Sequence, residues 1–97
     1  MNATSNSPIL IEKEAVRKLT FPNAEVLSST EDRRRRDIEL NRALVLGNMD
    51  RSKVRIIFSD DEGKKMIETT IWAVTPERII LKSGMMIPVN RIHEIVT

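Results

Sequence analysis

Four consecutive arginines are the residues of this sequence with the clearest chemical capability. The run comprises Arg33, Arg34, Arg35 and Arg36. Guanidinium groups bind phosphate oxygens through paired hydrogen bonds and release counterions from nucleic acid, so the run could contact phosphates. However, it lies within the segment EDRRRRDIE, in which four acidic side chains balance the four arginines. This balance cancels the local field on which polyanion binding depends, and it favours a solvated, self-neutralised helix.

Helical spacing would pair these arginines with acidic residues of the same segment. Glu31 would face Arg35, and Asp32 would face Arg36, each four residues along the chain. Such an ion pair contributes about 0.2–0.5 kcal/mol to an exposed helix. Because an arginine fork can also bind the carboxylates of another protein, the run is a candidate interaction surface.

A second group of basic residues is expected on the outer face of the predicted strands. It comprises Lys53, Arg55, Arg78 and Lys82. These side chains could form a track for nucleic acid, but single-strand binders usually stack bases on exposed rings, and this chain has only two Phe, one Trp and no Tyr. Alternating basic and apolar residues also keep the outer face of a soluble strand hydrated. We therefore favour a hydrated surface and keep nucleic acid binding as the alternative.

The sequence contains no recognisable catalytic or metal-binding motif. The absence of cysteine excludes disulfides, thiolate metal sites and cysteine nucleophiles. His93 is the only histidine, and no nucleophile or carboxylate forms a motif around it. Asp60, Asp61 and Glu62 lack the alternating oxygen ligands of a calcium loop and are predicted to be turn residues. Trp72 is expected in the core or at its rim. These features predict a non-enzymatic protein without a cofactor or a metal.

Length and charge are typical of a small soluble domain. The 97 residues suit one compact domain, and 16 basic against 14 acidic side chains leave a net charge of +2, which attracts polyanions only weakly over distance. The opening residues, MNATSNSPILIEKEA, have neither the basic start of a signal peptide nor an apolar run long enough to span a membrane. We expect a soluble, cytoplasmic protein.

The N-terminal part of the chain is predicted to be mobile at first and then helical. Residues 1–7 are small and polar and are expected to be mobile. Residues 8–37 are expected to form a helical extension: Pro8 can begin a short helix that ends near Thr20, residues 21–27 form an extended connector, and the hydroxyls at 28–30 can cap a second helix. The apolar run LNRALVLGN then ends in a Gly-Asn turn signal, which predicts a strand over residues 40–46.

Residues 38–97 are predicted to form a small β domain. Over residues 53–59, apolar and polar side chains alternate with the period of a half-buried strand. Gly63 can take the positive φ that the loop DDEGK needs to form a hairpin with the next strand. That strand, KMIETTIWAVT, becomes apolar on both faces and is expected to bend sharply between two faces. A second hairpin, from ERIILK to MMIPV, and a last strand, RIHEIVT, complete the series.

These elements predict a mainly β fold with an N-terminal helix, arranged as a small five-stranded antiparallel SH3-like barrel or a strongly bent sheet. The run from Val54 to Val96, which ends in KSGMMIPVNRIHEI, resembles the SH3-like and Sm-like small barrels. Chains of these barrels often pass through a short turn into a brief closing strand. The Gly and Asn positions by which Sm proteins hold RNA have no clear match here, so the resemblance implies a fold without implying RNA binding.

The function expected from these features is a non-enzymatic protein-interaction module that binds another protein or a second copy of itself. RNA or DNA binding through the arginine run and the strand cations is the alternative. Neither a membrane nor a small-molecule ligand is an expected partner.

Overall fold

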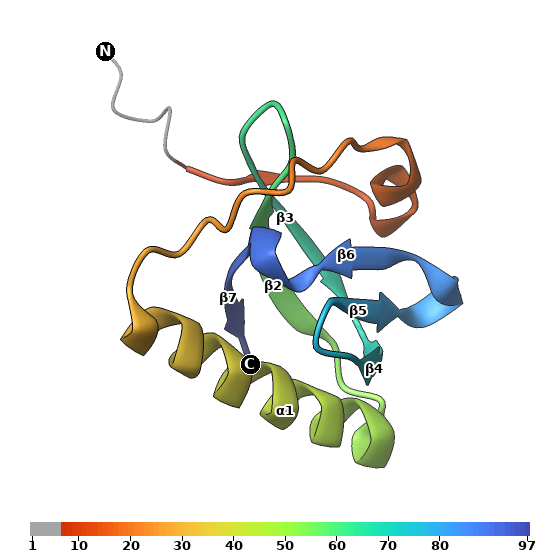
Figure 1. The fold of residues 1–97 in the computed structure, drawn as a ribbon. Coiled ribbons are helices and arrows are strands. Elements are labelled where there is room, and N and C mark those ends of the chain that lie inside the picture. The colour runs from red at the N-terminus through yellow and green to blue at the C-terminus, as the bar shows by residue number, and fades with distance from the viewer. Residues whose placement is uncertain (1–6) are drawn as a thin grey trace.

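The computed structural model describes residues 7–97 of the protein (Figure 1). Within this range the chain forms one α-helix, seven strands and three short 3-10 helices. The helical elements are η2 (Lys13–Lys18), α1 (Thr30–Asp50), η3 (Lys82–Gly84) and η4 (Val89–Arg91). The strands are β1 (Ile9–Leu10), β2 (Val54–Ser59), β3 (Lys64–Thr69), β4 (Ile71–Val74), β5 (Arg78–Leu81), β6 (Met86–Pro88) and β7 (Ile92–Val96). The predicted mobile segment, residues 1–7, lies outside the described residues except for Ser7. A mainly β fold with a helix in the N-terminal half is confirmed.

The strands form two sheets. The first has the order β1-β3-β2-β7, and the second has the order β4-β5-β6. Neighbouring strands are antiparallel, except that β1 runs parallel to β3. The hairpin between β2 and β3 is confirmed, and Gly63 in its loop has the predicted positive φ, 146°. The alternation predicted for β2 is also confirmed, since Val54, Ile56 and Phe58 are buried.

The long strand predicted over KMIETTIWAVT is divided between the two sheets. β3 ends at Thr69 and β4 begins at Ile71, so the chain changes sheet at Thr70. Thr69 and Thr70 are both buried. The crossing lies in the segment where the sequence predicts a bend, and it places side chains of one continuous segment on both sheets.

The prediction of a closed five-stranded barrel is wrong. The two sheets are separate, and they hold seven strands because β1 joins the first sheet and the predicted long strand is divided. The edge of β7 is occupied by side chains of α1 instead of by another strand. Arg36 donates a hydrogen bond to the carbonyl oxygen of Ile92, and Glu39 accepts one from the amide of Ile95. Backbone groups satisfied in this way are not free to pair with β6.

α1 is longer than predicted and replaces the strand expected over residues 40–46. Leu40, Ala43 and Gly47 are buried at spacings of three and four residues, so one face of the helix packs against the sheets. A Cβ atom on Gly47 would lie 2.5 Å from the carbonyl oxygen of Ile71 on β4, which is too close. Gly47 therefore permits the close approach of α1 to β4 and does not mark a turn.

The helical extension predicted over residues 8–37 is present in part, because the extended connector at 21–27 and the helix that begins after the hydroxyls at 28–30 are both found, whereas the first helix is only partly formed. This range contains β1, the short helix η2 and an extended connector, and its predicted end at residue 37 falls inside α1. β1 pairs with the edge of β3, and the amide of Ile11 donates to the carbonyl oxygen of Met66. Because this pairing satisfies backbone groups without a helix, extended structure replaces the start of the first predicted helix, and only Lys13–Lys18 are helical, as a 3-10 helix.

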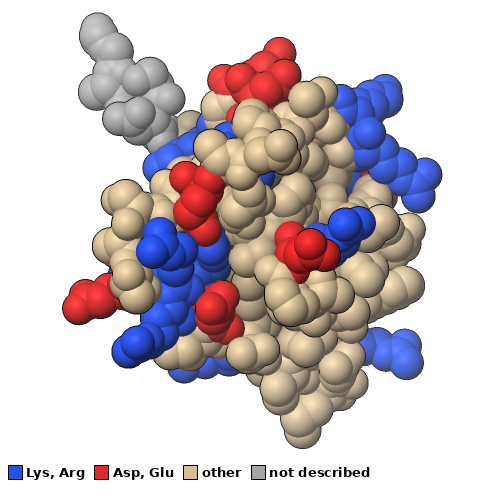
Figure 2. Space-filling view, viewed as in Figure 1, with Lys and Arg blue, Asp and Glu red and all other residues tan. Residues whose placement is uncertain are grey.

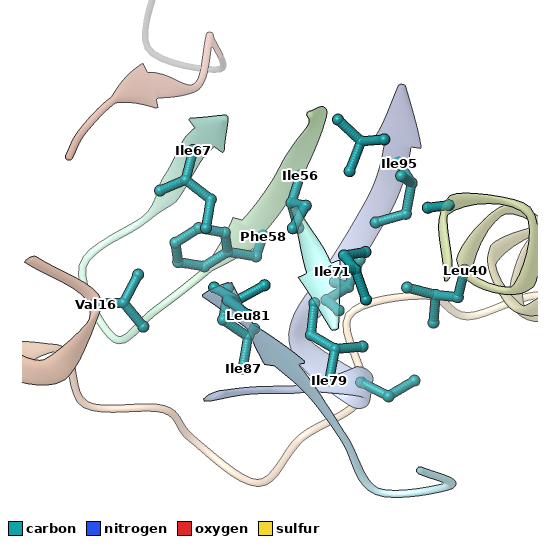
Figure 3. Packing of buried hydrophobic residues seen from close by; sticks show 14 of the residues in the cluster. Val16, Leu40, Ile56, Phe58, Ile67, Ile71, Ile79, Leu81, Ile87 and Ile95 are labelled. Atoms are coloured by element: carbon teal, nitrogen blue, oxygen red, sulfur yellow. The ribbon is translucent and has the colours of Figure 1, made fainter. Parts of the chain in front are cut away.

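The hydrophobic core lies between the two sheets and α1 (Figure 3). The side chains labelled there come from η2, from α1 and from both sheets, and they include Val16, Leu40, Ile67 and Ile79. The ring of Phe21, in the connector, packs against that of Phe58 with the centroids 5.9 Å apart. The segment before α1 therefore belongs to the same core as the strands.

Candidate interaction surface

Arg36, predicted as part of an exposed arginine surface, is buried, with a relative exposure of 4%. Its Nη1 and Nη2 donate to the carboxylate oxygens of Glu25 at 2.7 and 2.6 Å, and Nη1 also donates to the carbonyl oxygen of Ile92 at 2.9 Å. The hydrogen bond from Arg36 lowers the pKa of the Glu25 carboxyl below its ordinary value. Arg36 therefore joins the connector, α1 and β7, and its guanidinium is not available to a partner.

Arg33 also acts within the fold. Its Nη1 donates to the carbonyl oxygens of Leu27 and Ser28 at 3.0 and 3.4 Å. Next to it, Ser29 Oγ accepts a hydrogen bond from the amide of Asp32 at 3.0 Å and caps α1, which confirms the predicted capping hydroxyl. Arg33 therefore fastens the connector to the first turn of the helix.

The other two arginines of the run, Arg34 and Arg35, are exposed. Nη1 of Arg35 lies 3.5 Å from Oδ1 of Asp32, so Asp32 pairs with Arg35 and not with the predicted partner Arg36. Figure 2 shows basic side chains grouped with acidic ones at the N-terminal end of α1. Half of the predicted arginine surface thus remains at the surface, beside acidic groups.

The outer face of α1 carries an apolar line that the sequence-based prediction missed. We call Ile38, Val45 and Met49 the outer stripe; their exposed fractions are 54%, 53% and 77%. Spacings of seven and four residues place them on one side of the helix, opposite the buried face that contains Gly47. The spacing is visible in the sequence, but the assignment of residues 40–46 to a strand concealed it.

Two exposed arginines flank the outer stripe. Arg34 lies one turn before Ile38, and Arg42 lies one turn after it. Among residues 7–97, neither arginine has a carboxylate within 4.0 Å. The outer face of α1 therefore carries apolar and basic side chains, with the exposed Glu31 seven residues before Ile38 at its N-terminal end. The guanidinium groups of Arg34 and Arg42 are open to an external carboxylate.

The four predicted strand cations do not share one face. Lys53 and Lys82 line the same hollow. Arg55 forms an ion pair across β2 and β3 at 3.4 Å. Nη1 of Arg78 lies 3.8 Å from Sδ of Met86, at a different part of the surface. Lys53 also lines a second hollow, with Arg55. The structure therefore brings Lys53 together with Lys82 and with Arg55, and it separates Arg78 from them.

The pairing of β2 with β7 brings together a serine and a histidine that no motif connects in the sequence. Ser59 Oγ and His93 Nε2 are 2.7 Å apart. Burial, with the nearby cations Lys64 and Arg91, lowers the pKa of His93 below its ordinary value. A serine can act as a nucleophile only where a substrate reaches it, yet Ser59 is buried and is not among the residues lining the hollow at His93. The pair serves to link two strands.

The acidic cluster of the β2–β3 loop is used within the loop. Asp60, Asp61 and Glu62 bring their carboxylates close together. However, Nζ of Lys65 lies 2.8 and 2.9 Å from the two carboxylate oxygens of Asp60, and two loop amides donate to Oδ1. Burial opposes the ionisation of Asp60, but these hydrogen bonds outweigh it and hold the pKa of the carboxyl below its ordinary value. This arrangement fits the predicted turn role.

The chain matches no protein-family model, no curated protein and no solved structure. No helix within residues 7–97 combines the length and the apolar character needed to cross a lipid bilayer. The chemistry of the surface is therefore the basis for inferring function, and the outer face of α1 is its most distinctive feature.

Proposed function

We propose that this protein is a non-enzymatic interaction module and that the outer face of α1 docks onto another protein. The observation that carries the proposal is the outer stripe, whose side chains are 54%, 53% and 77% exposed on the side of the helix opposite the core. A helix packed on a sheet usually turns a polar face to water, and a rimmed apolar patch typically marks a contact region. Full burial of one such side chain contributes about 1.5–3 kcal/mol.

The partner fitted by this face is an acidic, amphipathic segment of another protein. Its apolar side chains would cover Ile38, Val45 and Met49, and its carboxylates would bind the forks of Arg34 and Arg42. Charge complementarity of this kind raises the rate of association and excludes like-charged partners.

A second copy of this chain fits the face less well. Two α1 helices packed through the outer stripe would bring Arg34 and Arg42 of one copy near the same arginines of the other. Like charges placed together at an interface are costly. Self-association is therefore an outcome of the test below and not the proposal.

We also propose that residues 54–96 share the architecture of the SH3-like and Sm-like small barrels, with one seam open. The chain order from β2 to β7, the change of sheet at Thr70 and the short turn η4 before β7 support this proposal. The seam lies between β6 and β7, where α1 covers the edge of β7. Such an architecture does not by itself specify a ligand.

Site-specific photo-crosslinking would test the docking face. A photoreactive residue at position 45 should crosslink, in extract, to a segment rich in both acidic and apolar residues, because the outer stripe and its arginines recognise that chemistry. The same residue at position 77, which is exposed in the β4–β5 turn, is the matched control. Identical products from both positions, or a basic crosslinked segment, would contradict the proposal.

A pair of methionine variants tests the same face by charge. Met49→Glu places a carboxylate in the outer stripe and should abolish the crosslink from position 45. Met86→Glu changes an exposed methionine on β6 and should leave the crosslink intact. Light scattering on the wild type and both variants tests self-association. If the wild type is a dimer and Met49→Glu makes it a monomer, the partner of the outer stripe is a second copy of this chain and not an acidic segment.

A further inference from the structure

A hollow between the C-terminal end of α1 and the start of β4 has the composition of a binding site. Its volume is about 450 Å³, within the range of about 300–1,000 Å³ that is usual for small-ligand pockets. Its polar and aromatic lining comprises Asn48, Arg51, Lys53, Thr70, Trp72 and Lys82. None of the outer-stripe residues lines this hollow, so its role does not depend on the docking proposal.

Trp72 is at the surface, so the expectation of a core position is wrong and only the alternative of a position at the rim of the core remains. It is 51% exposed, whereas Ile71 beside it is fully buried. The pairing of β4 with β5 shifts register between Ile71 and Ala73, so Trp72 is the extra residue of a β-bulge. Bulges redirect side chains and are frequent beside functional sites. The bulge presents an indole ring to the hollow, where it can serve as a stacking surface.

Three cations line the hollow without an accompanying carboxylate. They are Arg51, Lys53 and Lys82, and in the described part of the chain none has an acidic oxygen within 4.0 Å. The other hollows described for this surface all include at least one Asp or Glu. The hollow at Trp72 is therefore suited to an anion.

Buried Thr70 holds two of these cationic residues in place through their backbones. Its hydroxyl donates to the carbonyl oxygen of Arg51 at 3.3 Å, and its carbonyl oxygen accepts from the amide of Lys82 at 3.0 Å. Thr70 is only 5% exposed and directly precedes β4, which carries Trp72. The backbones of Arg51 and Lys82 are thus joined through the residue that precedes the strand carrying Trp72.

The backbone of Arg51 gives a separate indication. It ends α1 in the left-handed conformation, with a φ of 55°. Helices commonly place glycine at such a position, because a side chain there is strained. Non-glycine residues held in this conformation occur more often at functional sites than elsewhere. Here the arginine side chain lines the hollow.

We infer that the hollow at Trp72 binds a nucleotide unit, with the base stacked on the indole ring and the phosphates held by Arg51, Lys53 and Lys82. Guanidinium and ammonium groups provide charge-assisted hydrogen bonds to phosphate oxygens, and indole stacks on any base. The amide of Asn48 can donate to and accept from a base edge. One ring accommodates one base, and Phe21 and Phe58 pack together in the core. Recognition should therefore depend little on base sequence.

Two sources could supply this chemistry, a free nucleotide or one unit of single-stranded nucleic acid. Trp72 is the only tryptophan and the chain has no tyrosine, so intrinsic fluorescence reports on this hollow directly. The full chain is titrated with a short oligothymidylate, with thymidine triphosphate and, as a base-free control, with tripolyphosphate. Quenching by the oligonucleotide or by the nucleotide supports the site, and the tighter of the two identifies the source.

Salt dependence and variants provide the quantitative test. If the oligonucleotide is the ligand, three phosphate contacts predict a slope of about −2 for log K against log salt concentration, and about −0.7 after Lys53→Gln and Lys82→Gln together. Measured with a labelled oligonucleotide, Trp72→Leu should weaken binding about tenfold, and Trp72→Phe should restore most of it. Arg78→Gln, which removes an exposed strand cation outside the hollow, is the matched control and should leave affinity unchanged.

Arg51→Gly separates binding from stability. Glycine relieves the left-handed strain, so the thermal midpoint should stay the same or rise while affinity for the bound nucleotide or oligonucleotide falls several-fold. The inference is overturned if neither nucleic acid nor nucleotide quenches Trp72 at low salt. It is also overturned if tripolyphosphate quenches Trp72 and competes as well as the nucleotide, because base stacking would then contribute nothing.

Discussion

Arg36 shows how burial changes the role of a side chain that the sequence places on a surface. The residue has acidic neighbours at helical spacing, yet its guanidinium binds Glu25, eleven residues earlier, at 2.6 and 2.7 Å. Local spacing identifies which charges are close along a helix, whereas only the fold determines which face of the helix is covered. The arginine run is consequently divided into two structural and two exposed side chains.

Arg36→Met should lower the free energy of unfolding by about 2–4 kcal/mol, because it leaves Glu25 and the carbonyl oxygen of Ile92 without their donor. Denaturant unfolding measures this loss. Arg35→Met is the control, because its ion pair with Asp32 is solvent-exposed, and it should change stability by less than about 0.5 kcal/mol. Equal effects of the two variants would contradict the structural role of Arg36.

His93 should make stability depend on pH. Burial holds its pKa in the folded protein below the ordinary value of 6.5, so the unfolded chain binds more protons once the pH falls below that value. Stability should therefore be fully present above pH 6.5 and decline as the pH falls towards the folded-state pKa. Denaturant unfolding across a pH series checks this expectation.

His93→Gln is the control for that series. It should remove the decline that begins near pH 6.5. The losses at lower pH should persist, because the carboxyl pKa values of Glu25 and Asp60 also lie below their ordinary values in the folded protein. A variant with the same pH profile as the wild type would show that His93 is not responsible.

At the scale of elements, the main difference between prediction and structure concerns residues 38–50. The run LNRALVLGN is apolar enough for a buried strand and also suits one face of a helix, and periodicity cannot distinguish the two over so short a segment. The helix is favoured because it buries Leu40, Ala43 and Gly47 together on the face that packs against the sheets. The outer stripe, and with it the proposed docking face, exists only because this segment is helical.

Gly47→Ala tests the packing of α1 on β4. Alanine is the better helix former by about 1 kcal/mol, so an exposed helix would gain stability. Here the new Cβ would meet the backbone oxygen of Ile71 at 2.5 Å, and the variant should lose about 1–3 kcal/mol. Thermal unfolding shows directly whether Gly47→Ala lowers or raises the stability of the protein.

Asn48→Ala, at the exposed neighbouring position, is the control for that substitution and should be neutral or slightly stabilising. If Gly47→Ala were stabilising as well, the close approach of helix and strand would be wrong. The destabilisation of one variant and not the other is therefore the diagnostic result.

At the scale of the whole molecule, the segment before α1 and the strands share one core. Val16 is 3% exposed, and the guanidinium of Arg91 donates to the carbonyl oxygen of Ala24 at 2.8 Å. The same segment forms β1 beside β3 and covers part of the surface of the β domain (Figure 1). Folding and stability should therefore involve residues 9–27 together with the strands.

Amide hydrogen exchange tests whether residues 9–27 fold together with the strands. The amides of Ile11 and Val26 donate to the carbonyl oxygens of Met66 and Asn90, so both should be protected from exchange and should open together with the strands. Exchange at the rate of an unfolded peptide at these two positions, alongside protection in β2, would show that the N-terminal segment does not belong to the folded unit.

The sequence by itself determined the strands of the C-terminal half, the hairpin at Gly63 and the cap of α1. Each depends on a period of two residues or on a single turn or capping residue, and such signals act over a few neighbours. The tertiary structure decided the helical state of residues 40–46, the burial of Arg36, the division of the strands into two sheets with α1 at the edge of β7, and the meeting of Trp72 with Arg51, Lys53 and Lys82. These features depend on contacts between segments far apart in the chain, where burial and backbone pairing outweigh local preference.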